Sequence, residues 1–245
     1  MVERERHQLQ EVGGKKLYFM LKQELQELGI KIGRDKFLNL LRDNGLLKKR
    51  KKYRKPVTDS KHPFRKYKNL IKELLIDRSD QVWVSDITYI RVGGRWNYLT
   101  LVTDVYSRKI VGYSLSEGMS VEETTIKAMK MAFRVRDKTR QTILHSDRGI
   151  QYCNPSFVKW TNKQGIRTSM GERGNPYDNA IAERMNGILK YEFGLSYEFK
   201  NYELAKAETA KAVKLYNDKR PHWSLELKTP NQVYQNENKE VSLSY

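Results

Sequence analysis

The chain has 245 residues, enough for one large domain or for a core with a small helical module. Hydrophobic residues make up 38%, and 15 Gly and 6 Pro are too few for a disordered or collagen-like chain. The single cysteine, Cys153, excludes an internal disulfide and a multi-cysteine zinc site. Because no apolar run is long enough to span a membrane or to form a secretory signal, we expect a soluble, intracellular protein. The net charge of +18 indicates a polyanionic partner.

The positive charge is concentrated in one segment. Residues 48–68 carry a net +10, whereas residues 1–47 carry +2 and residues 69–245 carry +6. Three aromatic residues and two prolines interrupt the basic run. We interpret this segment as an extended linker that lies along DNA phosphates, the alternative being a merely solvated linker. The residues predicted to contact DNA here are Lys48, Lys49, Arg50, Lys51, Lys52, Arg54 and Lys55.

Two short helices are predicted before this linker. Leucines recur at helical spacing between residues 17 and 28, and Gly29 follows them as a stop. A second amphipathic helix is predicted from about Arg34, with Gly45 as its end. The pair resembles a helix-turn-helix DNA-binding unit, a weakly specific pattern because many small folds contain two helices and a glycine.

The rest of the chain predicts a mixed α/β layer fold. Residues 82–90, 96–105 and 109–115 are rich in β-branched and aromatic residues, and Gly93-Gly94 lies between the first two runs as a hairpin turn. We therefore expect three consecutive antiparallel strands, followed by helices packed on a central sheet. The later elements expected are a helix over 121–135 with a Ser120–Glu123 capping box, strands over 142–146 and 166–169, a helix opened by Pro155, a helix capped by Asp178 and a final helix over 202–216.

Three carboxylates stand out by their positions. Asp86 lies in the middle of the first apolar strand, Asp147 directly follows the fourth strand, and Glu183 lies early in the helix begun near Asp178. If the first and fourth strands are neighbours and the helix crosses their ends, the three side chains converge. Such a cluster repels itself unless cations occupy it, and Mg²⁺ prefers oxygen ligands. Taken singly, each residue also has an ordinary explanation as a hydrogen-bonded strand residue, a turn residue or a solvated helix residue.

The sequence around these residues resembles a known superfamily. The blocks are VWVSDITYI, LHSDRGIQY and NPYDNAIAERMNGILK, with 60 residues between the two aspartates and 35 between Asp147 and Glu183. Together with the tail LYNDKRPHWSLELKTPNQVY, they resemble the DDE transposases and retroviral integrases. More narrowly, they are similar to the second-frame (OrfB) transposase of bacterial insertion sequences that use two overlapping frames.

The resemblance implies a ribonuclease-H-like (integrase) catalytic core and a catalytic triad of Asp86, Asp147 and Glu183. It implies that these residues are ligands of two Mg²⁺ (or Mn²⁺) ions, that Lys190 contacts DNA, and that the element ends are first joined into a circular intermediate. By helical spacing, Asn179 and Asn186 share the face of Glu183 and could orient it or donate to a phosphate. Neither His145 nor His222 is assigned as a ligand.

We therefore expect a transposase that cleaves and joins double-stranded DNA at insertion-sequence ends, as a homo-oligomer, in the cytoplasm and associated with the bacterial nucleoid. The alternatives are a ribonuclease-H-like nuclease without strand transfer and a DNA-binding regulator with a decayed core. The expected domains are a helix-turn-helix-like module over 1–47, a basic linker over 48–79, the integrase-type core with C-terminal helices over 80–237 and a tail over 238–245.

Overall fold

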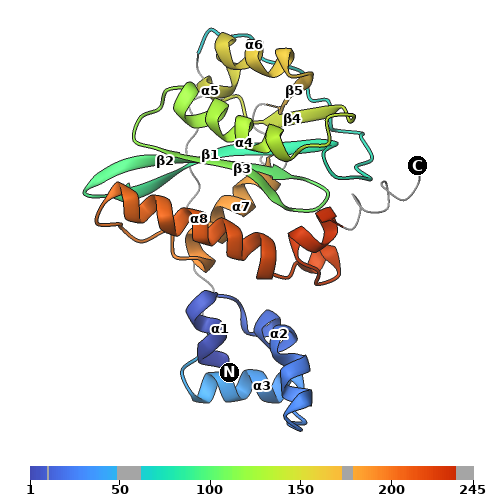
Figure 1. The fold of residues 1–245 in the computed structure, drawn as a ribbon, viewed down its shortest axis with the longest axis vertical. Helices are drawn as coiled ribbons and strands as arrows, with labels where there is room; N and C mark the ends of the chain where they lie inside the picture. The colour runs from blue at the N-terminus through green and yellow to red at the C-terminus, as the bar shows by residue number, and fades with distance from the viewer. Residues whose placement is uncertain (10, 49–61, 173–178, 236–245) are drawn as a thin grey trace.

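The computed structural model describes residues 1–9, 11–48, 62–172 and 179–235. A central sheet carries helices on both faces, and a separate group of three N-terminal helices lies beyond one of these helical layers (Figure 1). No helix in these described ranges has the length and apolar character that crossing a membrane requires.

The sheet has five strands in the order β3-β2-β1-β4-β5. The first three strands pair antiparallel, as predicted, while β4 pairs parallel with β1 and β5 pairs parallel with β4. The first and fourth strands are therefore neighbours, which is one of the two conditions for convergence of the carboxylates. The strands are β1 (Val82–Val92), β2 (Arg95–Asp104), β3 (Ile110–Ser116), β4 (Thr142–Ser146) and β5 (Ile166–Met170).

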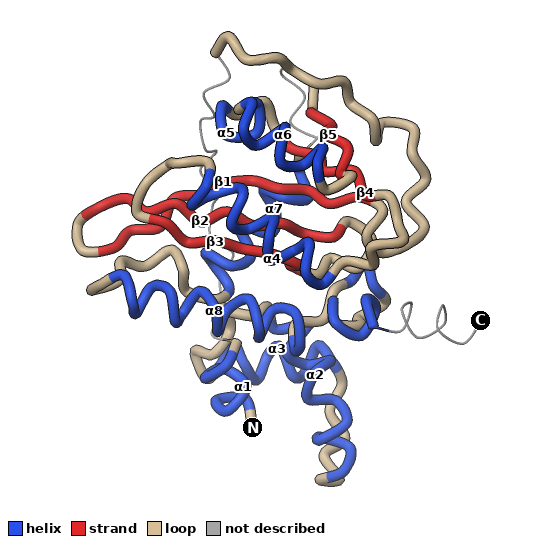
Figure 2. The backbone as a smooth tube through the Cα atoms, turned by 45° about the horizontal axis from the view of Figure 1, so that its top comes forward, coloured by secondary structure: helices blue, strands red, loops and turns tan. Residues whose placement is uncertain are grey.

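The helices divide between the two faces of the sheet (Figures 1 and 2). On one face, Trp83 and Val102 of the sheet pack with Met129 and Phe157 of the covering helices. On the other face, Leu99 packs with Met185 and Val213 of the last two long helices. The first layer contains α4 (Lys127–Val135), α5 (Ile150–Cys153) and α6 (Pro155–Lys163), and the second contains α7 (Ala180–Glu192) and α8 (Tyr202–Lys219), which a short 3-10 turn follows (Trp223–Leu225).

The helix expected over 121–135 begins differently from the prediction. Glu122–Ile126 forms a π-helical turn, and the regular helix α4 starts only at Lys127. The Ser120 hydroxyl accepts from the Glu123 backbone N–H at 3.3 Å, which is one of the two bonds of the predicted capping box. The Thr124 hydroxyl donates to the Ser120 carbonyl, and the Ser114 hydroxyl on β3 donates to the Glu123 carbonyl. These side-chain contacts engage the first carbonyls of the turn and accompany its wider winding.

The N-terminal module contains three helices, α1 (Val2–Gln8), α2 (Gly14–Glu27) and α3 (Arg34–Asp43). The last two confirm the predicted pair, and Gly29 and Gly45 after them adopt φ values of +71° and +67°. The module has its own apolar cluster, against which Phe193 and Leu215 of the core pack. The backbone N–H of Glu11 also donates to the Glu192 carbonyl at 3.3 Å. The module is thus seated against the end of α7.

Part of the segment expected to be a linker packs on the core. Phe64 and Tyr67 pack against the cluster around Trp83, and the Leu70 N–H donates to the Ser169 hydroxyl on β5 at 2.8 Å. The aromatic residues at positions 64 and 67 are therefore used for packing. Residues 49–61, which hold most of the basic run, lie outside the described residues, as does the predicted cap Asp178.

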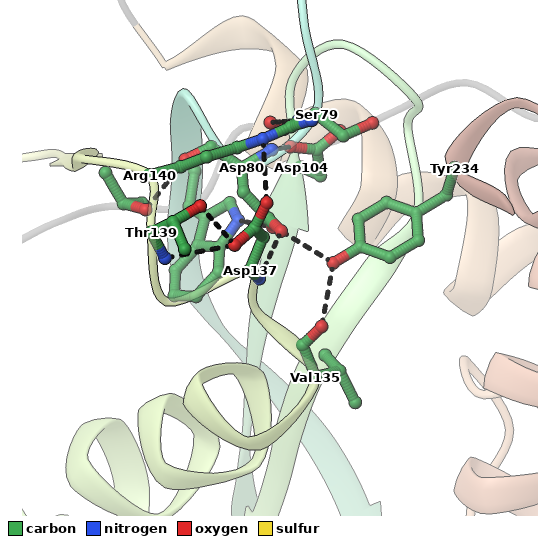
Figure 3. Close-up of polar contacts among 10 residues, drawn as sticks. Ser79, Asp80, Asp104, Val135, Asp137, Thr139, Arg140 and Tyr234 are labelled. Carbon is green, nitrogen blue, oxygen red and sulfur yellow. Dashed lines mark hydrogen bonds and ion pairs between the residues drawn. The ribbon is translucent and has the colours of Figure 1, made fainter. Parts of the chain in front are cut away.

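A buried polar network fixes the edge of the sheet where β1 begins (Figure 3). The Asp80 carboxylate accepts from the Trp83 indole N–H at 3.0 Å, the Tyr234 hydroxyl at 2.9 Å and the Asp137 N–H at 3.1 Å. The Asp80 N–H donates to Asp104 Oδ2 at 2.8 Å. Burial raises the pKa of Asp104 to about 7. This network ties the C-terminal segment, through Tyr234, to the end of the sheet where β1 begins.

Candidate functional site

The register of two parallel strands brings Asp86 and Asp147 together. Ser85 on β1 pairs with Ser146 on β4, so each aspartate is the next residue beyond a paired position. Because the strands run in the same direction, both carboxylates emerge at the same end of this strand pair. Their mutual repulsion appears directly in the pKa of Asp86, to which Asp147 contributes an upward shift. The structure therefore brings these two predicted residues to one place.

Asp86 is the most buried of the three predicted carboxylates. Its exposed fraction is 8%, and burial, with the nearby Asp147 charge, raises its pKa to about 8. Two hydrogen bonds hold its carboxylate. Oδ1 accepts from the Ile87 N–H at 2.9 Å, and Oδ2 accepts from Asn186 Nδ2 at 2.8 Å. A buried carboxylate needs such donors, or a nearby cation, to stay charged.

Asp147 is held by the tight exit from β4. Its Oδ1 accepts from the Gly149 N–H at 2.9 Å. A Cβ at position 149 would lie only 2.9 Å from the same oxygen, so a larger residue there would push the carboxylate aside. The glycine noted in the sequence thus permits the close approach of the backbone to Asp147.

Glu183 lies in the first turn of α7, on the side from which it also raises the pKa of Asp86. Its contribution to that pKa is smaller than that of Asp147. Across the described ranges, no three His, Cys, Asp or Glu side chains are grouped closely enough to hold an ion as they stand. The arrangement is therefore a close aspartate pair with a third carboxylate more loosely associated on the facing helix.

The two asparagines that flank Glu183 contact β1. Asn186 donates to Asp86 as described, and Asn179 Nδ2 donates to the Ser85 carbonyl at 3.4 Å. The predicted sharing of one helix face leads here to contacts with the strand. The Oδ1 atoms of both asparagines are buried and accept no hydrogen bond from the described part of the chain.

Lys190 also lies along β1, and Lys48 lies on the module. Lys190 Nζ donates to the Thr88 hydroxyl at 3.3 Å, two residues after Asp86, and burial lowers the pKa of this lysine. Lys48 forms an ion pair with Glu11 at 3.1 Å. The other predicted DNA contacts, at positions 49–52, 54 and 55, lie outside the described residues.

Neither histidine near the motifs lies among these carboxylates. His145 is fully buried in the sheet, where its Nδ1 hydrogen-bonds the Ser169 hydroxyl at 2.8 Å. His222 packs edge-on against Tyr216 and accepts from Arg220 at 3.0 Å.

Sequence reasoning missed one neighbour of the aspartates. Tyr152 is buried, its hydroxyl lies 2.8 Å from the Ser85 hydroxyl, and the Asp86 and Asp147 charges add to the effect of burial in raising its pKa. Tyr152 follows Asp147 by five residues in the HSDRGIQY block, but only the fold shows that its hydroxyl contacts Ser85 on β1.

The donor set is chemically suited to a hard divalent cation. Its three carboxylates, with the two buried amide oxygens nearby, offer oxygen ligands only, which Mg²⁺ and Mn²⁺ favour. Ligation would also relieve the repulsion that raises the pKa of Asp86.

Comparison with known proteins identifies relatives along most of the chain. Two models described as integrase core domains match residues 77–176 and 164–230. An insertion element IS600 uncharacterized 31 kDa protein from Shigella sonnei is 37% identical over 204 residues, covering 82% of this chain and 75% of that protein. The transposase InsF for insertion sequence IS3A from Escherichia coli K12 is 33% identical over 184 residues, covering 74% of this chain and 64% of that protein.

Solved structures show the same fold. The HTLV-2 integrase catalytic core, determined in complex with magnesium, matches with a TM-score of 0.52 at 19% identity, covering 64% of this chain and 97% of that one. The integrase fold of a simian T-cell lymphotropic virus intasome matches with a TM-score of 0.54 at 19% identity, covering 91% of this chain and 74% of that one. The ribonuclease-H-like core expected from the sequence is confirmed, and the chain belongs to the DDE transposase and integrase family of bacterial insertion sequences.

Proposed function

We propose that this transposase cleaves DNA at the ends of its insertion sequence and joins the released ends to another phosphodiester, with Asp86, Asp147 and Glu183 as its catalytic residues. The observation that carries the proposal is the parallel register of β1 and β4. That register sets Asp86 beside Asp147, while α7 brings Glu183 to the same end of the strands.

In this proposal the three carboxylates hold two Mg²⁺ (or Mn²⁺) ions. Such a pair supplies Lewis-acid activation of an attacking oxygen and stabilisation of the leaving oxygen. The chain's own groups prepare the site. The hydrogen bond from Asn186 holds the Asp86 carboxylate toward α7. Burial of Asp86 keeps bulk water from screening its charge.

Direct phosphoryl transfer fits this site because no nucleophilic side chain is required. A water attacks first, and the 3′-hydroxyl that it releases attacks the second phosphodiester. Lys190, two helical turns after Glu183, is proposed to contact the DNA backbone, and the basic run over 48–55 is proposed to follow it further.

The partner in this proposal is double-stranded DNA, both element end and target. Because two DNA ends must be held together for joining, we propose a homo-oligomer assembled on DNA, in the cytoplasm and associated with the nucleoid. For the domains, we propose that residues 1–47 form a DNA-binding module, that the basic linker continues to residue 79 and packs in part on the core, that the catalytic unit runs over 80–237, and that 238–245 form a tail.

The test is a joining assay. Labelled oligonucleotides carrying the element end are incubated with the protein, a supercoiled plasmid and Mg²⁺. The proposal predicts labelled plasmid or joined ends. Nicking of the oligonucleotide with no joined product would instead identify a nuclease of the same fold.

A further inference from the structure

A second group of charged side chains lies between the N-terminal module and the core, apart from the aspartate pair. Lys16 is in the first turn of α2, Arg108 precedes β3, and Arg184 is the fifth residue of α7, directly after Glu183. They line one cavity of about 540 Å³, together with Trp223 and other residues of α7 and the C-terminal segment. Three cations thus meet where the module docks on the core.

The described acids near Lys16 and Arg108 already accept hydrogen bonds from other groups. Both oxygens of Glu192 accept from Arg220 at 2.7 Å, and Asp104, whose charge acts on Arg108, accepts from Ser107 and from the Asp80 N–H. Lys16, by contrast, has an exposed fraction of only 9% and makes no hydrogen bond or ion pair with any described residue. Arg108 also has a buried Nη1 without an acceptor in the described chain. An anion in the cavity would supply the missing acceptors.

The electrostatics of the neighbours agree with that geometry. Burial and the charges of Arg220 and Arg184, opposed by the charge of Glu192, lower the pKa of Lys16 to about 8. The same cations, with Arg108, add to burial in lowering the pKa of His222 to about 2, so this histidine stays neutral and adds no further charge. A bound anion stabilises the charged form of a desolvated lysine beside two arginines.

The cavity also leads toward the proposed active site. A second cavity of about 620 Å³ shares Lys16, Arg184 and Trp223 with the first, and Glu183 and Lys48 line it as well. The two hollows therefore adjoin along the start of α7. A DNA strand that reaches Glu183 along this path passes the three cations.

We propose that Lys16, Arg108 and Arg184 bind a backbone phosphate of the DNA substrate, so that DNA bridges the N-terminal module and the core. This site rests on the proposed function for its substrate, and it adds a contact made jointly by the two parts of the chain. DNA is favoured over a free phosphate because the cavity shares Lys16, Arg184 and Trp223 with the hollow that Glu183 lines. Lys16 is then a phosphate ligand, although it lies on the module far along the chain from the carboxylates.

The experiment compares Lys16→Met with Lys15→Met. Both changes remove one charge from the same helix, but Lys15 is exposed and lines neither cavity. Binding to a fluorescent duplex is measured by anisotropy at several salt concentrations, without divalent ions. Lys16→Met should weaken binding about tenfold and reduce the salt slope by about one, whereas Lys15→Met should change both less. Equal effects of the two changes would overturn the proposal.

Thermal unfolding without DNA separates binding from folding. Lys16→Met removes a desolvated charge that neighbouring cations repel, so it should raise the Tm while weakening DNA binding. A lower Tm with unchanged DNA affinity would make Lys16 a structural residue and overturn the proposal. Arg184→Gln, at an exposed position of the same cavity, should weaken DNA binding without depending on packing.

Inorganic phosphate is the second probe. If it raises the Tm of the unaltered protein and this rise is lost in Lys16→Met while duplex binding is unchanged, the cavity serves a free phosphate and the DNA assignment is wrong. These measurements need neither metal nor cleavage, so a negative result would refute the phosphate site without refuting the proposed transposase activity. If the protein proved to have no transposase activity, the same binding measurements would still test the phosphate site.

Discussion

Asn186 offers a sharp test of how the site is held. Its Nδ2 donates to Asp86 Oδ2 at 2.8 Å, and this bond lowers the pKa of Asp86 against the raising effect of burial. Asn186→Leu keeps the volume of the side chain and removes the donor. A hydrogen bond to a charged group contributes about 1.5–3 kcal/mol, which corresponds to about a 10- to 100-fold change in an equilibrium.

The Mg²⁺ concentration that gives half-maximal DNA cleavage should therefore increase about 10- to 100-fold. Saturating Mg²⁺ should largely restore the activity. The sign of the pH effect follows from the lost bond. Without it the pKa of Asp86 rises further, protons compete better with the metal, and the defect becomes larger at pH 6.5 than at about pH 8.5.

The matched control is Met185→Leu. Met185 is the preceding residue of α7, is 1% exposed and packs in the core cluster with its sulfur beside the Tyr216 hydroxyl. A volume-conserving change there should cost less than about 1.5 kcal/mol and leave the Mg²⁺ dependence unchanged. An Asn186→Leu protein with the metal and pH dependence of the unaltered protein would refute the role assigned to this hydrogen bond.

Two further predictions concern stability and the basic segment. Because burial raises the pKa of Asp104 to about 7, from the usual 3.8, the folded state holds its proton more tightly than the unfolded state does. The free energy of unfolding should therefore fall as pH rises from about 4 to 7, and Asp104→Asn should reduce that slope by up to about 1.4 kcal/mol per pH unit in denaturant titrations; an unchanged slope would contradict the shift. Replacing the basic residues 48–52 with Gln should weaken binding to duplexes of unrelated sequence alike and flatten the salt dependence, and an unaltered salt slope would show that this segment does not touch phosphates.

The strands and most helices could be predicted because their signals are local. The β-branched runs of β1 and β2 and the glycine pair between them specify a hairpin without help from the rest of the chain. The π-helical start before α4 could not be predicted in this way, because the Ser114 hydroxyl that donates to the Glu123 carbonyl comes from the strand β3, outside the helix. The helix α1 was also missed; an ion pair between Arg4 and Glu24 joins it to α2.

The candidate site divides in the same manner. The positions of Asp86 inside the first strand and of Asp147 directly after the fourth could be inferred from the pattern, and the parallel register of β1 and β4 brings both residues to the same end of this strand pair. Helical spacing found Asn186 but assigned it to Glu183, since spacing gives the face of a helix and not the partner across it. In the sequence, Lys16 is indistinguishable from its exposed neighbour Lys15, and only docking of the module on α7 buries it.

The most direct test of the central claim is DNA cleavage by single carboxylate variants. Asp86→Asn, Asp147→Asn and Glu183→Gln are compared on a labelled duplex carrying the element end, with Mg²⁺ and then Mn²⁺. Asp104→Asn, a buried aspartate on the adjacent strand, and Glu203→Gln, in the first turn of α8, serve as controls. The account predicts that each of the first three loses more than about 100-fold in cleavage while retaining DNA binding, and that both controls stay active. Full cleavage by any of the first three would contradict it.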